Sequence, residues 1–104
     1  MLEELWVPIE GFPNYEISNY GRIVNVNTGM DLKPQVKKSG DLQVKLFDNG
    51  IASFWYLRRL VARAFFLNYS EDYNVLLING IKTDCTVANI QIDMIHEKRG
   101  PRSG

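Results

Sequence analysis

Seven basic side chains in the middle of the chain are the residues best suited to bind a charged ligand. Ammonium and guanidinium groups neutralise phosphates and donate hydrogen bonds to their oxygens, which is the main source of affinity for nucleic acids. Residues 33–63 contain seven such groups against two acids, a net charge of +5, although the whole chain is neutral. A surface that serves only solubility is the alternative. The predicted DNA-contacting residues are Lys33, Lys37, Lys38, Lys45, Arg58, Arg59 and Arg63.

One group of residues has the types that ligate metals. His96 is the only histidine, and Asp93 and Glu97 lie within three positions of it. Imidazole and carboxylate groups at this spacing can coordinate a cation. A lone histidine among charged residues near the end of a chain is more simply a solvated side chain, so we predict no metal site and no cofactor. Cys85 is the only cysteine and is expected to be a reduced bystander.

Short strands must position most of these residues. Asn19-Tyr20-Gly21 is typical of a turn in which glycine supplies positive φ, with strands on either side of it. Asp48-Asn49-Gly50 predicts a hairpin turn. In the first strand of that hairpin, Leu42, Val44 and Phe47 are the expected apolar residues among polar neighbours. The predicted strands in this half of the chain are Tyr15–Ser18, Arg22–Val26, Asp41–Phe47 and Ile51–Tyr56.

A single amphipathic helix of about ten residues is predicted from Leu57 to Phe66, because apolar residues recur there at helical spacing. The three arginines then lie on its flanks or its polar face. Strands at Asn74–Ile78 and Ile90–Ile92 follow, with one possible helical turn at Ile95–Arg99 before Gly100-Pro101. We expect most aromatic residues to pack in the core, with stacking on bases as the alternative, for Trp6, Phe12, Tyr15, Trp55, Tyr56, Phe65 and Phe66.

Length and composition favour one α+β domain of short antiparallel β-hairpins packed on one helix. The 104 residues suffice for one modest core, and 45% of them are hydrophobic. The longest apolar stretch, Leu60 to Leu67, is interrupted by Arg63 and is far shorter than the roughly 20 residues of a membrane span. Glu3 and Glu4 stand where a secretory signal needs basic residues, so we expect a cytoplasmic protein with no membrane partner.

Two stretches resemble known families. The first closely resembles the NUMOD-type modular domain that accompanies phage homing endonucleases, over Trp6–Phe12, Tyr15–Ile23 and Leu32–Pro34. The second is similar to the HNH nuclease domain that follows it in the same proteins, over Arg59–Ala62, Ala64-Phe65, Val75, Ile78–Gly80, Lys82-Thr83 and Asn89-Ile90. The resemblance implies a NUMOD-like segment at residues 1–50 and an HNH-like segment at residues 51–104, ending in a ββα unit, within one compact structure.

The resemblance also implies a ββα-metal site, in which a histidine activates water and a divalent cation stabilises the cleaved phosphate. Aligned on Gly80 and Asn89, the base falls at Leu77 and an adjacent metal ligand at Leu76, and leucine can neither accept a proton nor coordinate an ion. Asn89 survives as a remnant that ties its loop. Core residues are expected to have filled the former site. The other replaced positions are Arg58, Asn79 and Lys98.

These residues favour a phage protein that binds double-stranded DNA without cutting it. Charge reversal at Arg58, Arg59 and Arg63 is expected to abolish that binding. The alternative function is a small phage inhibitor that binds a bacterial host protein, such as a transcription, replication or defence factor, through the nuclease-derived scaffold. An exposed Leu76-Leu77 pair would favour this alternative, because exposed apolar patches mark contact sites.

Overall fold

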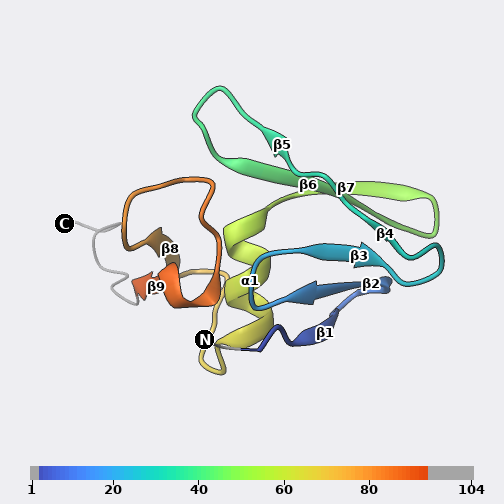
Figure 1. The fold of residues 1–104 in the computed structure, drawn as a ribbon, viewed down its shortest axis with the longest axis horizontal. Helices are drawn as coiled ribbons and strands as arrows, with labels where there is room; N and C mark the ends of the chain where they lie inside the picture. The colour runs from blue at the N-terminus through green and yellow to red at the C-terminus, as the bar shows by residue number, and fades with distance from the viewer. Residues whose placement is uncertain (1–2, 94–104) are drawn as a thin grey trace.

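The computed structural model describes residues 3–93, and the predicted helical turn at 95–99 lies outside them. Within that range the fold is α+β, with one α-helix and antiparallel strands in three sheets (Figure 1). The first sheet has the order β1-β2-β3-β4, the second β5-β6-β7 and the third β8-β9. Their bounds are β1 Trp6–Ile9, β2 Phe12–Ser18, β3 Ile23–Asn25, β4 Met30–Asp31, β5 Gln35–Val36, β6 Leu42–Asp48, β7 Ile51–Tyr56, β8 Asn74–Leu77 and β9 Ile90–Asp93.

The predicted β6–β7 hairpin is present and has the expected turn. Asn49 and Gly50 both have positive φ, 53° and 79°, as a two-residue type I′ turn requires. One side of the hairpin differs from the prediction. Leu46 is fully buried and Phe47 is 45% exposed, because side chains alternate along β6 and Leu46 continues the inward row of Leu42 and Val44. Phe47 therefore lies on the outer face.

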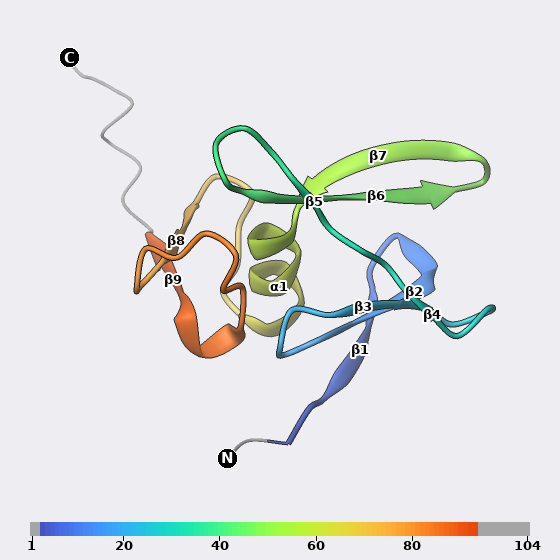
Figure 2. The ribbon, with the colours of Figure 1, turned by 45° about the horizontal axis from the view of Figure 1, so that its top comes forward.

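Helix α1 spans Leu57–Phe65 and lies at the centre of the molecule. It begins directly after β7 and buries Leu57, Leu60, Val61 and Ala62. Figure 2 shows it between the β5–β6–β7 sheet and the four-stranded sheet, with β8 and β9 beside it, and it contacts β1, β2, β6, β7, β8 and β9. Residues of both sequence segments thus share one core around the helix.

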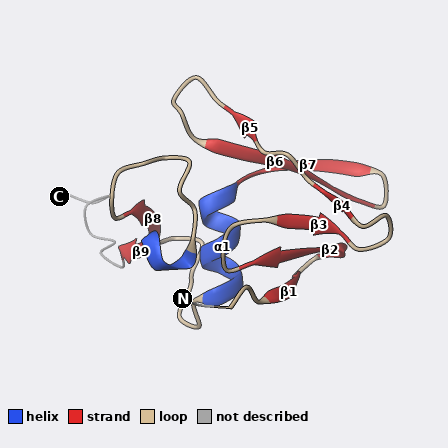
Figure 3. Cartoon of the chain, viewed as in Figure 1, coloured by secondary structure: helices blue, strands red, loops and turns tan. Residues whose placement is uncertain are grey.

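Strands β8 and β9 form an antiparallel hairpin, and the short 3-10 helix η1, Val87–Asn89, directly precedes β9. They lie on the opposite side of α1 from the β6–β7 turn (Figure 3). The strands predicted at 74–78 and 90–92 correspond to β8 and β9. The short strands β1, β4 and β5 were not predicted, because two to four residues carry too little alternation to show a period.

Core packing is confirmed for most of the aromatic residues. Tyr15 is buried, and Phe12, Trp55, Phe65 and Phe66 pack against the core. Trp6 and Tyr56 are the exceptions. Trp6 is half-buried outside the core cluster, with the Arg22 guanidinium 5.4 Å from its ring centroid, and Tyr56 is 41% exposed at the end of β7. No helix within residues 3–93 has the length and apolar character needed to cross a membrane.

Candidate nucleic-acid interface

Four predicted lysines lie in the β5–β6–β7 sheet or in the segments next to its strand β5. Lys33, Lys38 and Lys45 are exposed and Lys37 is half-buried. Among the described residues, none of the ion pairs involves these four lysines. Their ammonium groups therefore remain available to an anionic ligand.

The Lys37-Lys38 loop borders an open groove next to Tyr56. The groove is lined by Gln35, Val36, Lys37, Lys38, Ser39 and Tyr56. Hydrogen bonds from Lys37 N to Asp41 O at 2.9 Å and from Gly40 N to Lys37 O at 2.8 Å hold the loop backbone. The fixed loop places two lysine side chains beside one aromatic ring, an arrangement suited to a nucleic-acid backbone.

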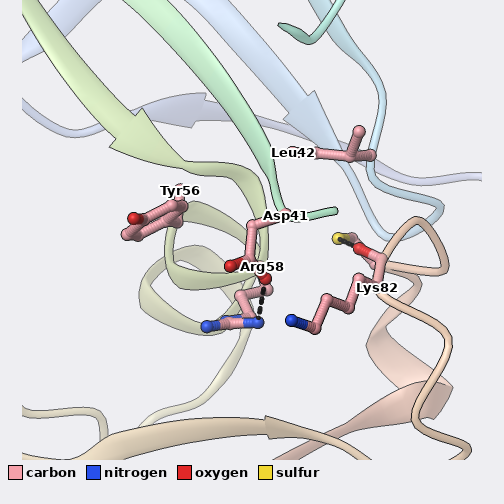
Figure 4. Close-up of a pocket in the computed structure, with 6 residues that line it drawn as sticks. Asp41, Leu42, Tyr56, Arg58 and Lys82 are labelled. Carbon is pink, nitrogen blue, oxygen red and sulfur yellow. Dashed lines mark hydrogen bonds and ion pairs between the residues drawn. The ribbon is translucent and has the colours of Figure 1, made fainter. Parts of the chain in front are cut away.

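The three predicted arginines have internal partners. Arg58 Nη1 donates to Asp41 Oδ1 at 2.7 Å (Figure 4). Arg59 donates to the Tyr69 hydroxyl at 2.7 Å and to the Tyr73 carbonyl at 3.2 Å. These contacts join α1 to the loops on either side of it. Charge reversal at these positions is therefore a test of folding as much as of DNA binding.

Arg63 is held in the same way. Its guanidinium donates to the Glu10 carbonyl at 3.0 Å, lies 4.9 Å from the Trp55 ring centroid and pairs with Glu71 at 3.7 Å. Arg63 therefore connects α1 to the turn after β1 through Glu10 and to β7 through Trp55. The arginines therefore have a role in the scaffold, and the predicted phosphate contacts of the three arginines and the four lysines stay predictions.

Asp41 is the centre of the cluster shown in Figure 4. A hydrogen bond from Ser39 Oγ, at 2.7 Å, and the charges of Arg58 and Lys82 hold the pKa of its carboxyl below the usual value. Lys82 Nζ in turn donates to the Ser39 carbonyl at 2.8 Å. The loop with Lys37 and Lys38, which we call the lysine loop, thus meets helix α1 and the 79–85 loop at the Asp41 carboxylate. Nearby Cys85 is buried, which raises the pKa of its thiol to about 11.

The positions that the HNH resemblance assigns to catalysis lie on β8. Leu76 is 45% exposed and Leu77 is half-buried against the core. The expectation that core residues fill this site is therefore correct for Leu77 and wrong for Leu76, because alternation along β8 directs successive side chains to opposite faces. Lys98, His96 and Glu97 lie outside the described residues.

Asn89 ties the loop between β8 and β9, as predicted for a structural remnant. Its side chain is buried, donates to Asn79 Oδ1 at 2.9 Å and Asp84 O at 2.8 Å, and accepts from Asn79 N at 3.0 Å. Hydrogen bonds from Thr86 and Asn79 lower the pKa of the Asp84 carboxyl. These polar groups thus form one hydrogen-bonded network within the loop.

The side chains at the positions that resemble the metal ligand and the base do not fit a divalent cation. Leu76 and Leu77 have only hydrocarbon side chains, and the amide oxygens of Asn79 and Asn89 both accept hydrogen bonds within the loop. Within residues 3–93 no group of three histidine, cysteine, aspartate or glutamate side chains is arranged to hold a metal ion.

Two features of the fold were not predicted. Phe47 and Phe54 are exposed beside Lys45, and the signal for them was the strict alternation of the hairpin. The second is a contact between the Asn19–Gly21 turn and the 85–87 loop, where Val87 N donates to Asn19 O at 2.9 Å. Nothing local in the sequence indicates this contact, since the partners are far apart along the chain.

Comparison with known proteins agrees with this architecture. The NUMOD4 motif matches residues 4–47. DNA endonuclease I-HmuI of Bacillus phage SP01 is 31% identical over 87 residues, which are 83% of this chain and 50% of the relative. The uncharacterized HNH endonuclease L247 of Acanthamoeba polyphaga mimivirus is 36% identical over 93 residues, 85% of this chain and 23% of the relative.

The fold is also similar to a solved structure. The structure that describes DNA binding and cleavage by the HNH homing endonuclease I-HmuI has a TM-score of 0.80 at 30% identity, over 85% of this chain and 51% of that one. This chain therefore spans about half the length of I-HmuI and less of L247.

Proposed function

Because the chain carries a NUMOD4 motif and is homologous to HNH homing endonucleases, we propose that it binds double-stranded DNA and does not cleave it. The homologues are endonucleases, and their shared scaffold supports DNA as the ligand. The observation that carries the binding is a set of four lysines that take part in none of the ion pairs within residues 3–93, Lys33, Lys37, Lys38 and Lys45.

The proposal of inactivity rests on the chemistry of β8. Hydrolysis of a phosphodiester needs a group that accepts a proton from water and a cation that stabilises the departing oxygen. Leu76 and Leu77 stand at the positions that resemble those of the ligand and the base, and neither side chain can do either task. A phage relative makes the cytoplasm of a bacterial host the proposed place of action.

The binding proposal is tested by titrating a labelled duplex at several salt concentrations. Replacing the four lysines with glutamine is expected to weaken affinity and to reduce the salt dependence by about 0.9 per lost phosphate contact, in units of log K per log salt. The matched control replaces the same lysines with arginine, which keeps the charge and should keep the binding. Equal binding by the glutamine variant would contradict the proposal.

The proposal of inactivity is tested by incubating supercoiled plasmid with the protein and Mg²⁺ or Mn²⁺. The plasmid is expected to stay supercoiled, with I-HmuI as the positive control for cleavage. Nicked or linear plasmid would refute inactivity if the cleaving activity stays with this protein through an additional column.

One observation favours a second function, binding to a bacterial host protein. Leu76, Ile78 and Ile81 are exposed aliphatic side chains on β8 and the loop after it, and such groups often mark protein contacts. A stoichiometric partner captured from bacterial lysate by the wild type, and lost with L76S/I78S, would support this function. Recovery of nucleic acid alone would count against it.

A further inference from the structure

The outer face of the β6–β7 hairpin has an unusual composition for a surface. The register pairs Gln43 with Tyr56, Lys45 with Phe54 and Phe47 with Ala52, so these residues share one side of the sheet. The opposite side is the buried row of Val44 and Leu46. We call Lys45, Phe47, Phe54 and Tyr56 the aromatic face.

The aromatic face is open to solvent. Phe54 is 58% exposed, and Phe47 and Tyr56 are exposed by 45% and 41%. Lys45 Nζ lies 5.6 Å from the centroid of the Phe54 ring and 5.7 Å from that of Phe47. Neither ring belongs to the buried cluster of the core. Packing of the core therefore does not explain why two exposed rings flank this ammonium group.

The charges around the aromatic face are complementary to an anionic ligand. Lys45 lies within it, and the groove bordered by Lys37 and Lys38 adjoins it at Tyr56. The nearest acids along β6 do not oppose this charge: Asp41 pairs with Arg58, and Asp48 belongs to the inward row by alternation. A polyanion can therefore follow the face from the lysine loop to the hairpin turn.

An exposed phenyl ring offers a flat apolar surface, which stacks on the flat face of a base. In an intact duplex each base face is covered by its neighbours, and only edges and phosphates are accessible. Unpaired bases have free faces, and the ammonium groups between and beside the rings can neutralise their phosphates. The aromatic face thus fits single-stranded nucleotides better than it fits paired ones.

We propose that the aromatic face binds unpaired bases of DNA, so that the protein prefers single-stranded or gapped DNA to an uninterrupted duplex. This inference rests on the proposed function and adds to it: the lysines bind an intact duplex through its phosphates, and unpaired bases add affinity through the rings. The lysines supply affinity for any phosphate backbone, and Phe47 and Phe54 supply the preference for unpaired bases.

The experiment measures fluorescence anisotropy with oligo-dT, an intact duplex and a duplex with an internal gap. The wild type is expected to bind oligo-dT and the gapped duplex more tightly than the intact one. F47L/F54L keeps apolar side chains but removes both rings, and should lower affinity for oligo-dT by roughly 5-fold or more per ring. Its affinity for the intact duplex should stay unchanged.

The matched control is I51A, which alters an exposed aliphatic residue of the same hairpin and should bind all three DNAs as the wild type does. Thermal unfolding checks that each variant is folded. If the intact duplex is preferred, or if F47L/F54L binds every DNA as the wild type does, the inference is wrong while the proposed function stands. If no DNA binds at low salt, both fail.

Two further outcomes would also overturn the inference. Equal loss of affinity for the intact duplex and oligo-dT in F47L/F54L would show that the face contacts paired DNA. A dimer in sedimentation that F47L/F54L converts to monomer would assign the face to a second copy of this chain.

Discussion

Asn89 satisfies three hydrogen-bonding groups of the loop between β8 and β9 with one buried amide. In a nuclease this asparagine helps to hold a catalytic base, according to the resemblance. Here the strand residues next to its loop are leucines, yet the amide network is complete. These hydrogen bonds give the asparagine a structural role in the loop.

Removing that amide should destabilise the protein. N89A leaves Asn79 N and Asp84 O without their partner, and unsatisfied buried polar groups cost about 1–3 kcal/mol each. We expect a decrease of about 2 kcal/mol or more in the free energy of unfolding, measured by urea denaturation. Q91A, an exposed position on β9, is the control with little expected effect. Equal stability of N89A and Q91A would show that the network is not needed.

The roles of the arginines are also decided at the scale of single residues. Arg58, Arg59 and Arg63 are basic residues, as phosphate-binding residues usually are. The sequence does not show whether a basic side chain has a partner inside the fold, so it cannot distinguish these arginines from the lysines. Their half-buried stems on α1 bring each guanidinium within reach of internal acceptors. By contrast, Lys33, Lys37, Lys38 and Lys45 take part in none of the ion pairs among the described residues.

At the scale of elements, the turn between β2 and β3 joins the NUMOD4 motif to the HNH-like hairpin. Gly21 has φ of 82°, and a Cβ built there would lie 2.9 Å from the Cys85 carbonyl oxygen. Asn19 in the same turn accepts from Leu5 N at 2.7 Å and donates to Glu3 O at 3.1 Å. The turn therefore requires glycine for two reasons, its backbone conformation and the close approach of the 85–87 loop.

These two reasons can be separated with a pair of variants. G29A introduces a side chain at φ of 76° with nothing within 4 Å, so only the backbone strain of about 1 kcal/mol applies. G21A adds the clash with Cys85, and its free energy of unfolding should fall by at least a further 1–2 kcal/mol. Urea denaturation of both proteins measures the difference. Equal losses would mean that the 85–87 loop moves away without cost.

At the scale of the whole molecule, one carboxylate connects three parts of the chain. Asp41 pairs with Arg58 on α1, and Lys82 from the 79–85 loop reaches the adjacent Ser39 carbonyl. The lysine loop is thereby fixed to the core that presents the aromatic face. We infer that the binding surface and the fold share this anchor.

The anchor should make stability depend on pH in the acid range. Since folding lowers the pKa of Asp41 below 3.8, its carboxylate stabilises the fold above that pH, and the contribution is lost as the pH falls through the folded value. D41N should therefore lower the free energy of unfolding at pH 7, and its deficit relative to wild type should shrink at pH 3. D48N, at an exposed turn, is the control. A deficit that stays constant with pH would contradict this role.

The sequence by itself determined the local elements of this protein. The Asn49-Gly50 turn, the helix beginning at Leu57 and the strands around Gly21 each follow from backbone preferences or periodicity of neighbouring residues. The resemblance of Trp6–Ile23 and of the Asn79–Asn89 region placed those elements in the NUMOD and HNH-like folds. These features are local, or they depend on motifs that can be read in order along the chain.

Only the tertiary structure decided which charged and aromatic groups are available to a ligand. The arginines are occupied because Glu10, Asp41 and Tyr69 reach them from distant segments, and no periodicity encodes such meetings. Phe47 is exposed because Leu46 takes the inward position in a register set by pairing with β7. Whether a side chain can reach a ligand depends on which distant segments pack against it. This is settled only when the three sheets and the helix are packed together.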